Sequence, residues 1–536
     1  MLKNMSKYFF QGKFWWVLFS VSYAILTIPA IRVTAGHLNP DGVVYILHAQ
    51  HLLKGEYTAS VSAYWGPLFS WLIAGIAAFR IDFLLSAKIV LLSCGYFFSI
   101  GVWVLSQRFI TNLYARLMLV IIMTGASLVW ATQILTPDLI VTTVLVWYFW
   151  ILTDPRFPSK RLSIIAGLLG GIAFLAKSYA LPFFLIHFSV TCILLRGQYK
   201  VAPNTDKARL PRNIIVWLYG LVAFSAVVLP WIMVLSVKYH RLEAGSSGRI
   251  NHALLRPGLA PLQHPIVSGL WEPPENTLTA WEDPTILPYP VWPRLSVTDR
   301  LREYGYIIEN NSQVALQLIQ YDLLRFSQMG IILLLLTALF ARLRKLYWWL
   351  LLTIVIYSMG YILTMTTADP RYFWPVLVLI AIFVFSVPEN LPLRKEYKVA
   401  LTLLFFASFS YQSLRDLRYL YWFTEPSTAY QEAADKIRSA YPLSSRVAAD
   451  NWKEGLYISF FLGNTTQYLG VPSSNTNDGF SHELTSSRID IFLRFFKTES
   501  GKALDSDTAW RQTLKIRLTG ADSSAHELEV FERNRL

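Results

Sequence analysis

Long apolar runs alternate with short polar segments along most of the chain. Eleven of these runs have the length, or nearly the length, of a membrane-spanning helix, which needs roughly 20 apolar residues. They cover residues 14–34, 83–105, 117–134, 139–152, 162–176, 179–195, 213–237, 327–341, 346–364, 372–387 and 398–414. The pattern predicts a polytopic α-helical membrane protein with about 11 spans.

One further run, residues 65–79, is too short to cross, because a helix of its length reaches only about 22 Å and the hydrocarbon core is about 30 Å thick. Lys and Arg concentrate in short cytoplasmic loops. If the run 65–79 does not cross, the basic clusters all fall on the inner side, including five Lys and Arg residues between positions 196 and 212. We therefore expect residues 65–79 to form a re-entrant or interfacial helix.

This topology places four segments together on the outer side: the loop 35–82, the turn 136–138, the loop 238–325 and the tail. The stretch 257–293 within the second loop holds nine prolines and three tryptophans. This number of prolines excludes a long helix or a central strand, and the three tryptophans argue against a flexible linker. We therefore expect this stretch to be a packed cover, since long irregular loops in compact proteins tend to be functional.

The tail shows the pattern of a small α/β domain. A helix is predicted at 429–440, and strands are predicted at 446–449, 466–469 and 527–531, while 487–496 fits either a helix or a strand. The chain is accordingly expected to divide into a transmembrane domain, residues 1–414, and an extracytoplasmic α/β domain, residues 415–536.

Composition excludes several other classes of protein. Hydrophobic residues make up 54% of the chain and charged residues 15%, whereas soluble domains have about 45–50% and about 25%. The aromatic share of 15% is too high for a disordered chain. The net charge is +14, and the basic residues lie mostly in short segments between apolar runs, as topology signals do. No nucleic acid is therefore expected as a partner. The two cysteines, Cys94 and Cys192, lie inside apolar runs and predict neither a disulfide framework nor a thiolate metal site.

A carboxylate just beyond the first span is the first candidate for chemistry. Pro40 and Asp41 are typical of the start of a helix, and Gly55 is typical of its end. Asp41, Tyr45 and His48 would share one face of that helix and could line a polar cleft. The alternative is that Asp41 only caps the helix.

Three more polar residues lie at predicted outer membrane edges: Asp138, Lys177 and Arg371. Each has an ordinary explanation, since Asp138 can cap a helix, Lys177 can snorkel and Arg371 can pair with Asp369. Together, however, the topology brings a candidate base, a second carboxylate and two cations to one membrane face. That is the set of groups needed to act on a phosphate-linked lipid, because the cations can stabilise a departing phosphate.

Two other readings remain open from the residues alone. His37, His48 and His51 with Asp41 make a divalent metal possible, although their loose spacing predicts no firm metal site. A transporter or flippase for a lipid-linked or anionic substrate is the alternative function. It would place charges near the bilayer midplane and show repeat symmetry, whereas the notable polar residues here gather at one face and no repeat is found.

The motifs around these residues resemble a known family. They are Asp41 with the Tyr45/Ala49/Leu53/Gly55 pattern behind it, Trp65-Gly66-Pro67-Leu68, Thr136-Pro137-Asp138, the segment 167–177, Arg371-Tyr372 followed by Pro375, and, in the tail, Asp450, Tyr457 and Tyr468-Leu469-Gly470. With these motifs the chain resembles the polyprenyl-phosphate-dependent, GT-C-type glycosyltransferases, especially bacterial relatives of the protein O-mannosyltransferases and of the aminoarabinose transferase that modifies lipid A. One departure is Gly42, because many relatives carry an Asp-Glu pair where this chain has Asp41-Gly42.

The resemblance implies a function and a role for each residue. It implies transfer of one sugar from a polyprenyl-phosphate donor to an extracytoplasmic glycolipid, glycan or protein, by direct displacement with inversion. It implies an enzyme of the bacterial cytoplasmic membrane whose active site faces outward. The residues expected in that site are Asp41 as base, Asp138 as second acidic residue, Lys177 and Arg371 at the donor phosphate, and Tyr45, His48 and Tyr372 in the substrate cleft.

Overall fold

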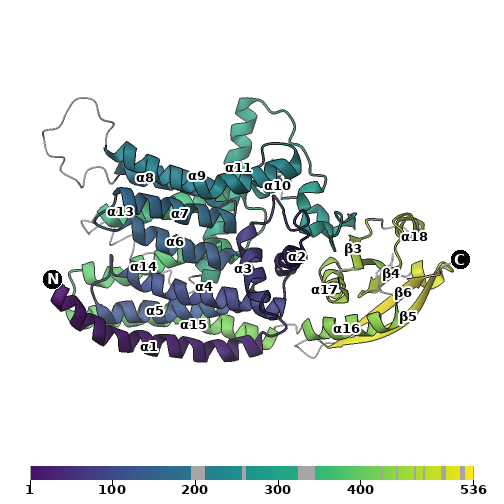
Figure 1. Cartoon of the computed structure of the whole chain (residues 1–536), viewed down its shortest axis with the longest axis horizontal. Helices are drawn as coiled ribbons and strands as arrows, with labels where there is room; N and C mark the ends of the chain where they lie inside the picture. Colours follow the sequence, from purple (N-terminus) through teal and green to yellow (C-terminus); the bar gives the residue numbers. More distant parts are fainter. Residues whose placement is uncertain are drawn as a thin grey trace.

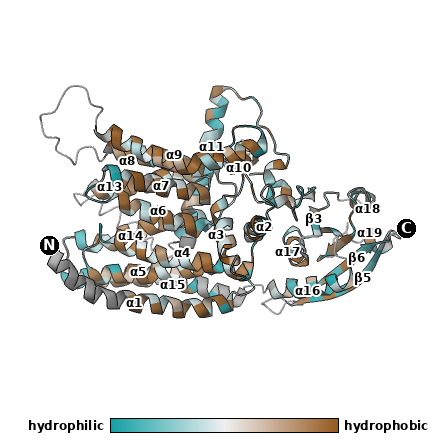
Figure 2. Cartoon of the chain, viewed as in Figure 1, coloured by the Kyte–Doolittle hydropathy of each residue, from teal (hydrophilic) through white to brown (hydrophobic). Residues whose placement is uncertain are grey.

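The computed structural model of the chain describes residues 2–194, 212–255, 261–323, 345–423, 427–441, 445–463, 466–474, 477–496, 503–519 and 525–534. A bundle of long helices forms one end of the molecule, and a small sheet with its own helices forms the other (Figure 1). The bundle helices carry mostly hydrophobic residues along their length (Figure 2).

Helices occupy ten of the eleven predicted apolar runs. They are α1 (Leu2–Val33), α4 (Phe83–Ser106), α5 (Leu113–Gln133), α6 (Asp138–Leu152), α7 (Lys160–Ala176), α8 (Ala180–Leu194), α9 (Arg212–Tyr239), α13 (Lys345–Thr364), α14 (Trp374–Asn390) and α15 (Lys395–Phe423). The remaining run, 327–341, lies outside the described residues. Among the described residues, five helices are long and apolar enough to cross a membrane: Phe83–Ser106, Leu113–Gln133, Ile214–Tyr239, Leu346–Thr364 and Pro370–Asn390. The chain is thus a polytopic helical membrane protein, and the count of eleven crossings stays a prediction.

Two short helices, α2 (Pro40–Lys54) and α3 (Pro67–Ala77), lie at the end of the bundle that faces the sheet (Figure 1). As predicted, α2 begins at Pro40 and ends before Gly55, which adopts the left-handed conformation (φ 79°) that glycine allows without strain. The 11 residues of α3 reach only about 16 Å, so α3 is too short to cross a membrane.

The loop after α9 contains only short regular elements until α11 (Val297–Gln317) and the π-helical turn η5 (Leu318–Leu323). These elements are α10 (Ser247–Leu254), η2 (Pro265–Val267), β1 (Gly269–Leu270), η3 (Ala280–Glu282) and η4 (Pro284–Ile286). The prolines explain their shortness, because each one removes a backbone donor. Trp281 of η3 is nevertheless buried, and the described part of the stretch packs as a cover rather than a linker.

The sheet has the strand order β1-β3-β2-β4-β6-β5. The strand β2 (Ser445–Ala449) runs parallel to β3 (Thr466–Val471) and β4 (Ile491–Arg494), while β6 (Ala525–Arg533) runs antiparallel to β4 and β5 (Trp510–Thr519). Its helices are α16 (Ser427–Ala440), α17 (Trp452–Leu462), α18 (Asn477–Ser486) and α19 (Ala503–Ser506). The predicted helix and three predicted strands of the tail are confirmed, and the ambiguous segment 487–496 contains the strand β4.

Two features tie the tail to the rest of the chain. The edge strand β1 comes from the loop 238–325 and pairs with β3, with Gly269 opposite Val471. The helix α15 continues past residue 414 to Phe423. The pairing of β1 with β3 is not visible in the hydropathy pattern, because it depends on a contact between distant segments.

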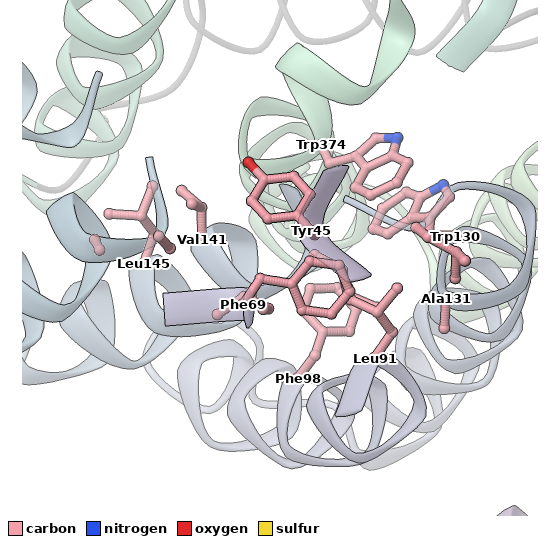
Figure 3. Packing of buried hydrophobic residues seen from close by; sticks show 14 of the residues in the cluster. Tyr45, Phe69, Leu91, Phe98, Trp130, Ala131, Val141, Leu145 and Trp374 are labelled. Atoms are coloured by element: carbon pink, nitrogen blue, oxygen red, sulfur yellow. The ribbon is translucent and has the colours of Figure 1, made fainter. Parts of the chain in front are cut away.

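A continuous aromatic core joins α2 and α3 to the bundle (Figure 3). Tyr45 of α2 lies against Phe69 of α3, with ring centroids 5.2 Å apart. Deeper in the bundle, Trp130 of α5 and Trp374 of α14 stack almost in parallel at 4.4 Å. Burial of such large rings contributes about 1.5–3 kcal/mol each, so the two short helices are fixed to the bundle by their own apolar faces.

Gly66, directly before α3, allows the closest approach between α3 and the end of α7. A Cβ atom at this position would lie 2.3 Å from the carbonyl oxygen of Ala176 and 2.6 Å from that of Leu175. Both are backbone atoms that cannot rotate away. The glycine therefore sets the position of the chain segment that leads directly into Lys177.

Gly66→Ala should lower the stability of the purified protein by about 1–3 kcal/mol, as overpacking typically does. The matched control is Gly75→Ala within α3, because a Cβ at Gly75 meets no atom within 4 Å. Thermal unfolding followed by tryptophan fluorescence would check this, with a lower midpoint expected for Gly66→Ala only. Equal midpoints for the two variants would contradict the close packing.

Candidate functional site

A cavity of about 1120 Å³ lies where α2, the turn 136–138, the ends of α7 and α13, and the loop after α9 meet. Six of the seven residues expected in the site line it: Asp41, Tyr45, Asp138, Lys177, Arg371 and Tyr372. The seventh, His48, does not. The structure thus brings together residues from segments that the topology prediction had placed on the outer side.

Asp41 forms an ion pair with Arg371. Its Oδ2 accepts a hydrogen bond of 2.9 Å from Nη1 of Arg371. Asp41 does not cap α2, because the N-cap residue is Asn39, whose side chain accepts instead from the backbone N–H of Leu135. Gly42 is required beside it, since a Cβ there would lie 2.8 Å from Cβ of Leu135.

Asp138 forms the second pair, with Lys177. Its Oδ1 lies 2.5 Å from Nζ of Lys177, and its Oδ2 accepts from the Thr136 hydroxyl at 2.8 Å. Lys177 follows the last residue of α7 and has an extended backbone, which turns its side chain from the helix toward Asp138. The Asp138 side chain is only 6% exposed, against 19% for Asp41. Asp138 is therefore the fixed carboxylate and Asp41 the more accessible one.

Arg371 connects the two pairs. Its Nε lies 2.9 Å from Oδ2 of Asp369 and 3.8 Å from Oδ2 of Asp138. Asp369 also accepts from the backbone N–H of Arg371, which fixes the turn at the start of η6 (Pro370–Phe373). Burial raises the pKa of the Asp369 carboxyl, and the charge of Arg371 only partly offsets this. The expected pairing of Arg371 with Asp369 is thus found, and Arg371 also pairs with Asp41, which the sequence did not predict.

Tyrosine rings surround the Lys177 ammonium. Its Nζ lies 4.6 Å from the ring centroid of Tyr372 and 5.8 Å from that of Tyr361. The two rings stack on each other at 5.1 Å. A cation over an aromatic face is stabilised by about 0.5–2 kcal/mol, so these rings help to hold the Lys177 ammonium in place. Tyr361 was not identified from the sequence, because it lies inside an apolar run with no motif to mark it.

The expectation that His48 lines the substrate cleft is wrong. His48 is buried, and its Nε2 donates to the backbone oxygen of Glu282 at 3.1 Å. The turn η3 of the cover packs over this part of α2 and closes the space beside it. Burial lowers the pKa of His48 to about 3, and the neighbouring charges of His51 and Lys238 act in the same direction.

The histidines do not form a metal site with Asp41. His37 contacts the backbone oxygen of Thr132, while His51 lies between the carboxylates of Glu56 (2.6 Å) and Glu282 (2.8 Å). Across the ranges that the structure describes, no group of three or more His, Cys, Asp or Glu residues could hold a metal ion. The residues present therefore do not fit the divalent-metal alternative.

Two further surfaces of the cavity are formed by residues that were not assigned to the site from the sequence. One is an aromatic wall formed by Tyr64, Trp65, His264 and Trp281. The other is an apolar surface contributed by α8 and α13, with Leu181, Pro182, Phe183, Ile186, Val355, Ile356, Met359 and Leu363. The motifs marked the charged residues with Tyr45 and Tyr372, whereas apolar side chains in a hydrophobic helix carry no distinguishing signal.

The fold is found among solved membrane proteins. No protein-family model matches the chain, and no curated protein sequence does either. The crystal structure of ArnT from Cupriavidus metallidurans bound to undecaprenyl phosphate is similar over 96% of this chain and 98% of that chain, with a TM-score of 0.57 and 11% identity. The oligosaccharyltransferase of Archaeoglobus fulgidus in its apo form covers 90% of this chain and 70% of its own length, with a TM-score of 0.51 and 10% identity. The chain therefore has the fold of the GT-C-type glycosyltransferases.

Proposed function

We propose that this chain is an integral-membrane glycosyltransferase that moves a sugar from a polyprenyl-phosphate donor to an extracytoplasmic acceptor. The observation that carries the proposal is the division of one cavity into a charged and an apolar part. The charged part holds two carboxylate–cation pairs, and the apolar part is a surface of α8 and α13. A lipid phosphate has this same division, with an anionic head and a hydrocarbon tail. The similar fold of ArnT, solved with undecaprenyl phosphate bound, supports this class of donor.

Lys177 and Arg371 are the proposed ligands of the donor phosphate. The planar guanidinium can bind two phosphate oxygens, while the ammonium acts as a point charge. Arg371 is paired with Asp41 through a single hydrogen bond of 2.9 Å. A phosphate that binds Arg371 competes with Asp41 for it, so donor binding releases the carboxylate that is needed as base.

Asp41 is the proposed general base, and Asp138 positions Lys177. In the described part of the chain, Oδ1 of Asp41 has no hydrogen-bond partner, whereas both oxygens of Asp138 are engaged. Asp41 accepts the proton of the acceptor hydroxyl as its oxygen attacks the anomeric carbon. The bond from that carbon to the phosphate oxygen breaks on the opposite face, so the configuration inverts. The departing polyprenyl phosphate is stabilised by Lys177 and Arg371.

The orientation follows from the distribution of loop charges. Basic residues lie between the apolar runs on the side away from α2, which is typical of the cytoplasmic face. The cavity, α2 and the tail then lie on the outer side of a bacterial cytoplasmic membrane. An acceptor that is a glycolipid, glycan or protein can reach the cavity from there. Because the donor is a lipid-linked sugar, no nucleotide-sugar site is needed.

Asp41→Asn should fold and bind donor but lose roughly 10²- to 10⁴-fold in turnover, because a general base typically contributes that much. The measurement is mass spectrometry of glycolipids, glycans and glycoproteins from cells that lack the gene, complemented with wild type or variant. A hexose or pentose should be missing and should return with wild type only.

The matched control for this experiment is Asp82→Asn. Asp82 also lies in the loop 35–82, but it caps α4 and does not line the cavity, and asparagine can keep that cap. Restoration by both variants would show that Asp41 is not the base. If no glycoconjugate changed although the protein was expressed, a transporter or flippase would replace the transferase proposal.

Lys177→Ala and Arg371→Ala should each weaken binding of undecaprenyl phosphate by roughly 10- to 150-fold, since a hydrogen bond to a charged group contributes about 1.5–3 kcal/mol. Binding to the protein in nanodiscs can be measured by native mass spectrometry. Lys54→Ala, a change at an exposed lysine outside the cavity, is the control and should bind like wild type. Unchanged binding by both site variants would rule out the phosphate role.

A further inference from the structure

The aromatic wall, Tyr64, Trp65, His264 and Trp281, forms one compact surface of the cavity. Tyr64 and Trp65 meet edge to face at 4.7 Å, and Trp65 meets Trp281 in the same way at 5.0 Å. His264 adds a further edge-to-face contact with Trp281 at 5.0 Å. Such contacts fix the rings relative to one another, so the wall presents a rigid surface.

The wall begins one helical turn from the proposed base. The ring of Tyr45, which follows Asp41 by one turn of α2, lies 5.4 Å from the ring of Trp65. Asp41, Tyr45 and all members of the wall line the same cavity. A molecule bound against the wall therefore lies within reach of the carboxylate that is to accept a proton.

Trp281 holds a polar group without a partner. Its residue is only 7% exposed, and within the described part of the chain its indole Nε1 is buried and makes no hydrogen bond. The neighbouring indole differs, because Nε1 of Trp65 donates to the backbone oxygen of Trp281 at 2.9 Å. Leaving a buried donor unpaired costs about 1–3 kcal/mol. Trp281 lines the cavity, so a ligand hydroxyl that reaches this donor would remove that cost.

Two buried carboxylates next to Trp281 hold this wall in place. Glu282 is fully buried, and its Oε1 accepts from the backbone N–H of Leu278 while its Oε2 contacts His51 at 2.8 Å. Asp283 accepts from the Tyr239 hydroxyl at 2.8 Å. The wall is thus preorganised by ties to α2 and α9, which lowers the entropy lost on binding.

The chemistry of the wall indicates an uncharged ligand. The charged side chains among the described cavity residues are Asp41, Asp138, Lys177 and Arg371. All four belong to the charged part of the cavity, and none belongs to the aromatic wall. Burial lowers the pKa of His264 to about 4, so this residue is neutral at pH 7. Aromatic faces with N–H or O–H groups at their edges match a sugar ring, which has C–H faces and a rim of hydroxyls.

We propose that Tyr64, Trp65, His264 and Trp281 form an acceptor subsite and that the acceptor group bound there is a neutral saccharide. This inference rests on the proposed transferase function and narrows its acceptor to a glycan or the sugar part of a glycolipid. The indole N–H of Trp281 binds an acceptor hydroxyl, and the rings pack against the sugar. The acceptor hydroxyl that reacts then points toward Asp41.

Binding of defined small probes tests the subsite without knowledge of the natural acceptor. The probes are the methyl β-glycosides of glucose and xylose and, as the competing class, the blocked peptide acetyl-Gly-Ser-Thr-amide. Saturation-transfer NMR on the protein in nanodiscs should show contact with the ring C–H protons of a glycoside. Trp281→Phe keeps an aromatic ring but removes the N–H, and should weaken that binding about 3- to 10-fold. Trp281→Ala should weaken it more.

Trp510→Phe is the matched control. Trp510 of β5 also has a buried indole N–H without a partner in the described residues, but it does not line the cavity. Its variant should bind the glycosides like wild type. Equal effects of Trp281→Phe and Trp510→Phe, or contact with the peptide alone, would overturn the saccharide subsite.

The two proposals can fail separately. If Asp41→Asn abolishes the glycoconjugate but Trp281→Phe leaves glycoside binding unchanged, the subsite is overturned and the transferase stands. If glycoside binding depends on Trp281 while loss of the gene changes no glycoconjugate in cells that otherwise express the protein, the sugar site is supported and the transferase is not.

Discussion

Charged side chains at the edge of a membrane domain are stable only when they are paired, and here the pairing determines how distant segments meet. Removing one partner of a buried ion pair typically costs about 3–5 kcal/mol, because the other charge remains uncompensated. Arg371 and Asp41 are 330 positions apart, yet their side chains are hydrogen-bonded at 2.9 Å. Lys177 reaches Asp138 in the same way. The two pairs, linked through Arg371, therefore hold α2 and the turn 136–138 against the end of α7 and against η6.

The pairing of buried charges also explains how the proline-rich loop can form a fixed wall of the cavity. Such a loop has few backbone hydrogen bonds of its own, so its side chains must provide the anchors. Glu282 and Asp283 do this from a buried position, with His51 of α2 and Tyr239 of α9 as partners. Burial opposes a charge on His51, but the carboxylates of Glu282 and Glu56 outweigh it and raise the pKa of His51. The paired charges thus replace regular secondary structure as the source of rigidity.

Local features of the sequence predicted the helices and the approximate place of the site, but not its contacts. Hydropathy is a local property, so ten predicted spans coincide with helices, and loop charges placed Asp41, Asp138, Lys177 and Arg371 on one side. The helical period correctly put His48 on the face of Asp41, yet that period cannot show which turn of a helix is covered by another segment. The covering residue, Glu282, lies 234 positions further along the chain. The helix α17 and the strand β5 were not predicted from the sequence, although β5 has 10 residues and places Leu514, Ile516 and Leu518 at the period-two spacing that marks a strand.

The difference between the two carboxylates follows from one hydroxyl group. Asp41 pairs with Arg371, while Asp138 pairs with Lys177 and lies 3.8 Å from Arg371. Both residues are aspartates, so residue type ranks neither as the base, and only the family resemblance assigned that role to Asp41. The Thr136 hydroxyl occupies the second oxygen of Asp138, and no described residue does the same for Asp41. A carboxylate with both oxygens engaged in a buried site is held by its partners and is poorly placed to accept a proton. Hydrogen-bond occupancy, rather than residue type or motif, thus distinguishes the accessible carboxylate from the one that orients a lysine.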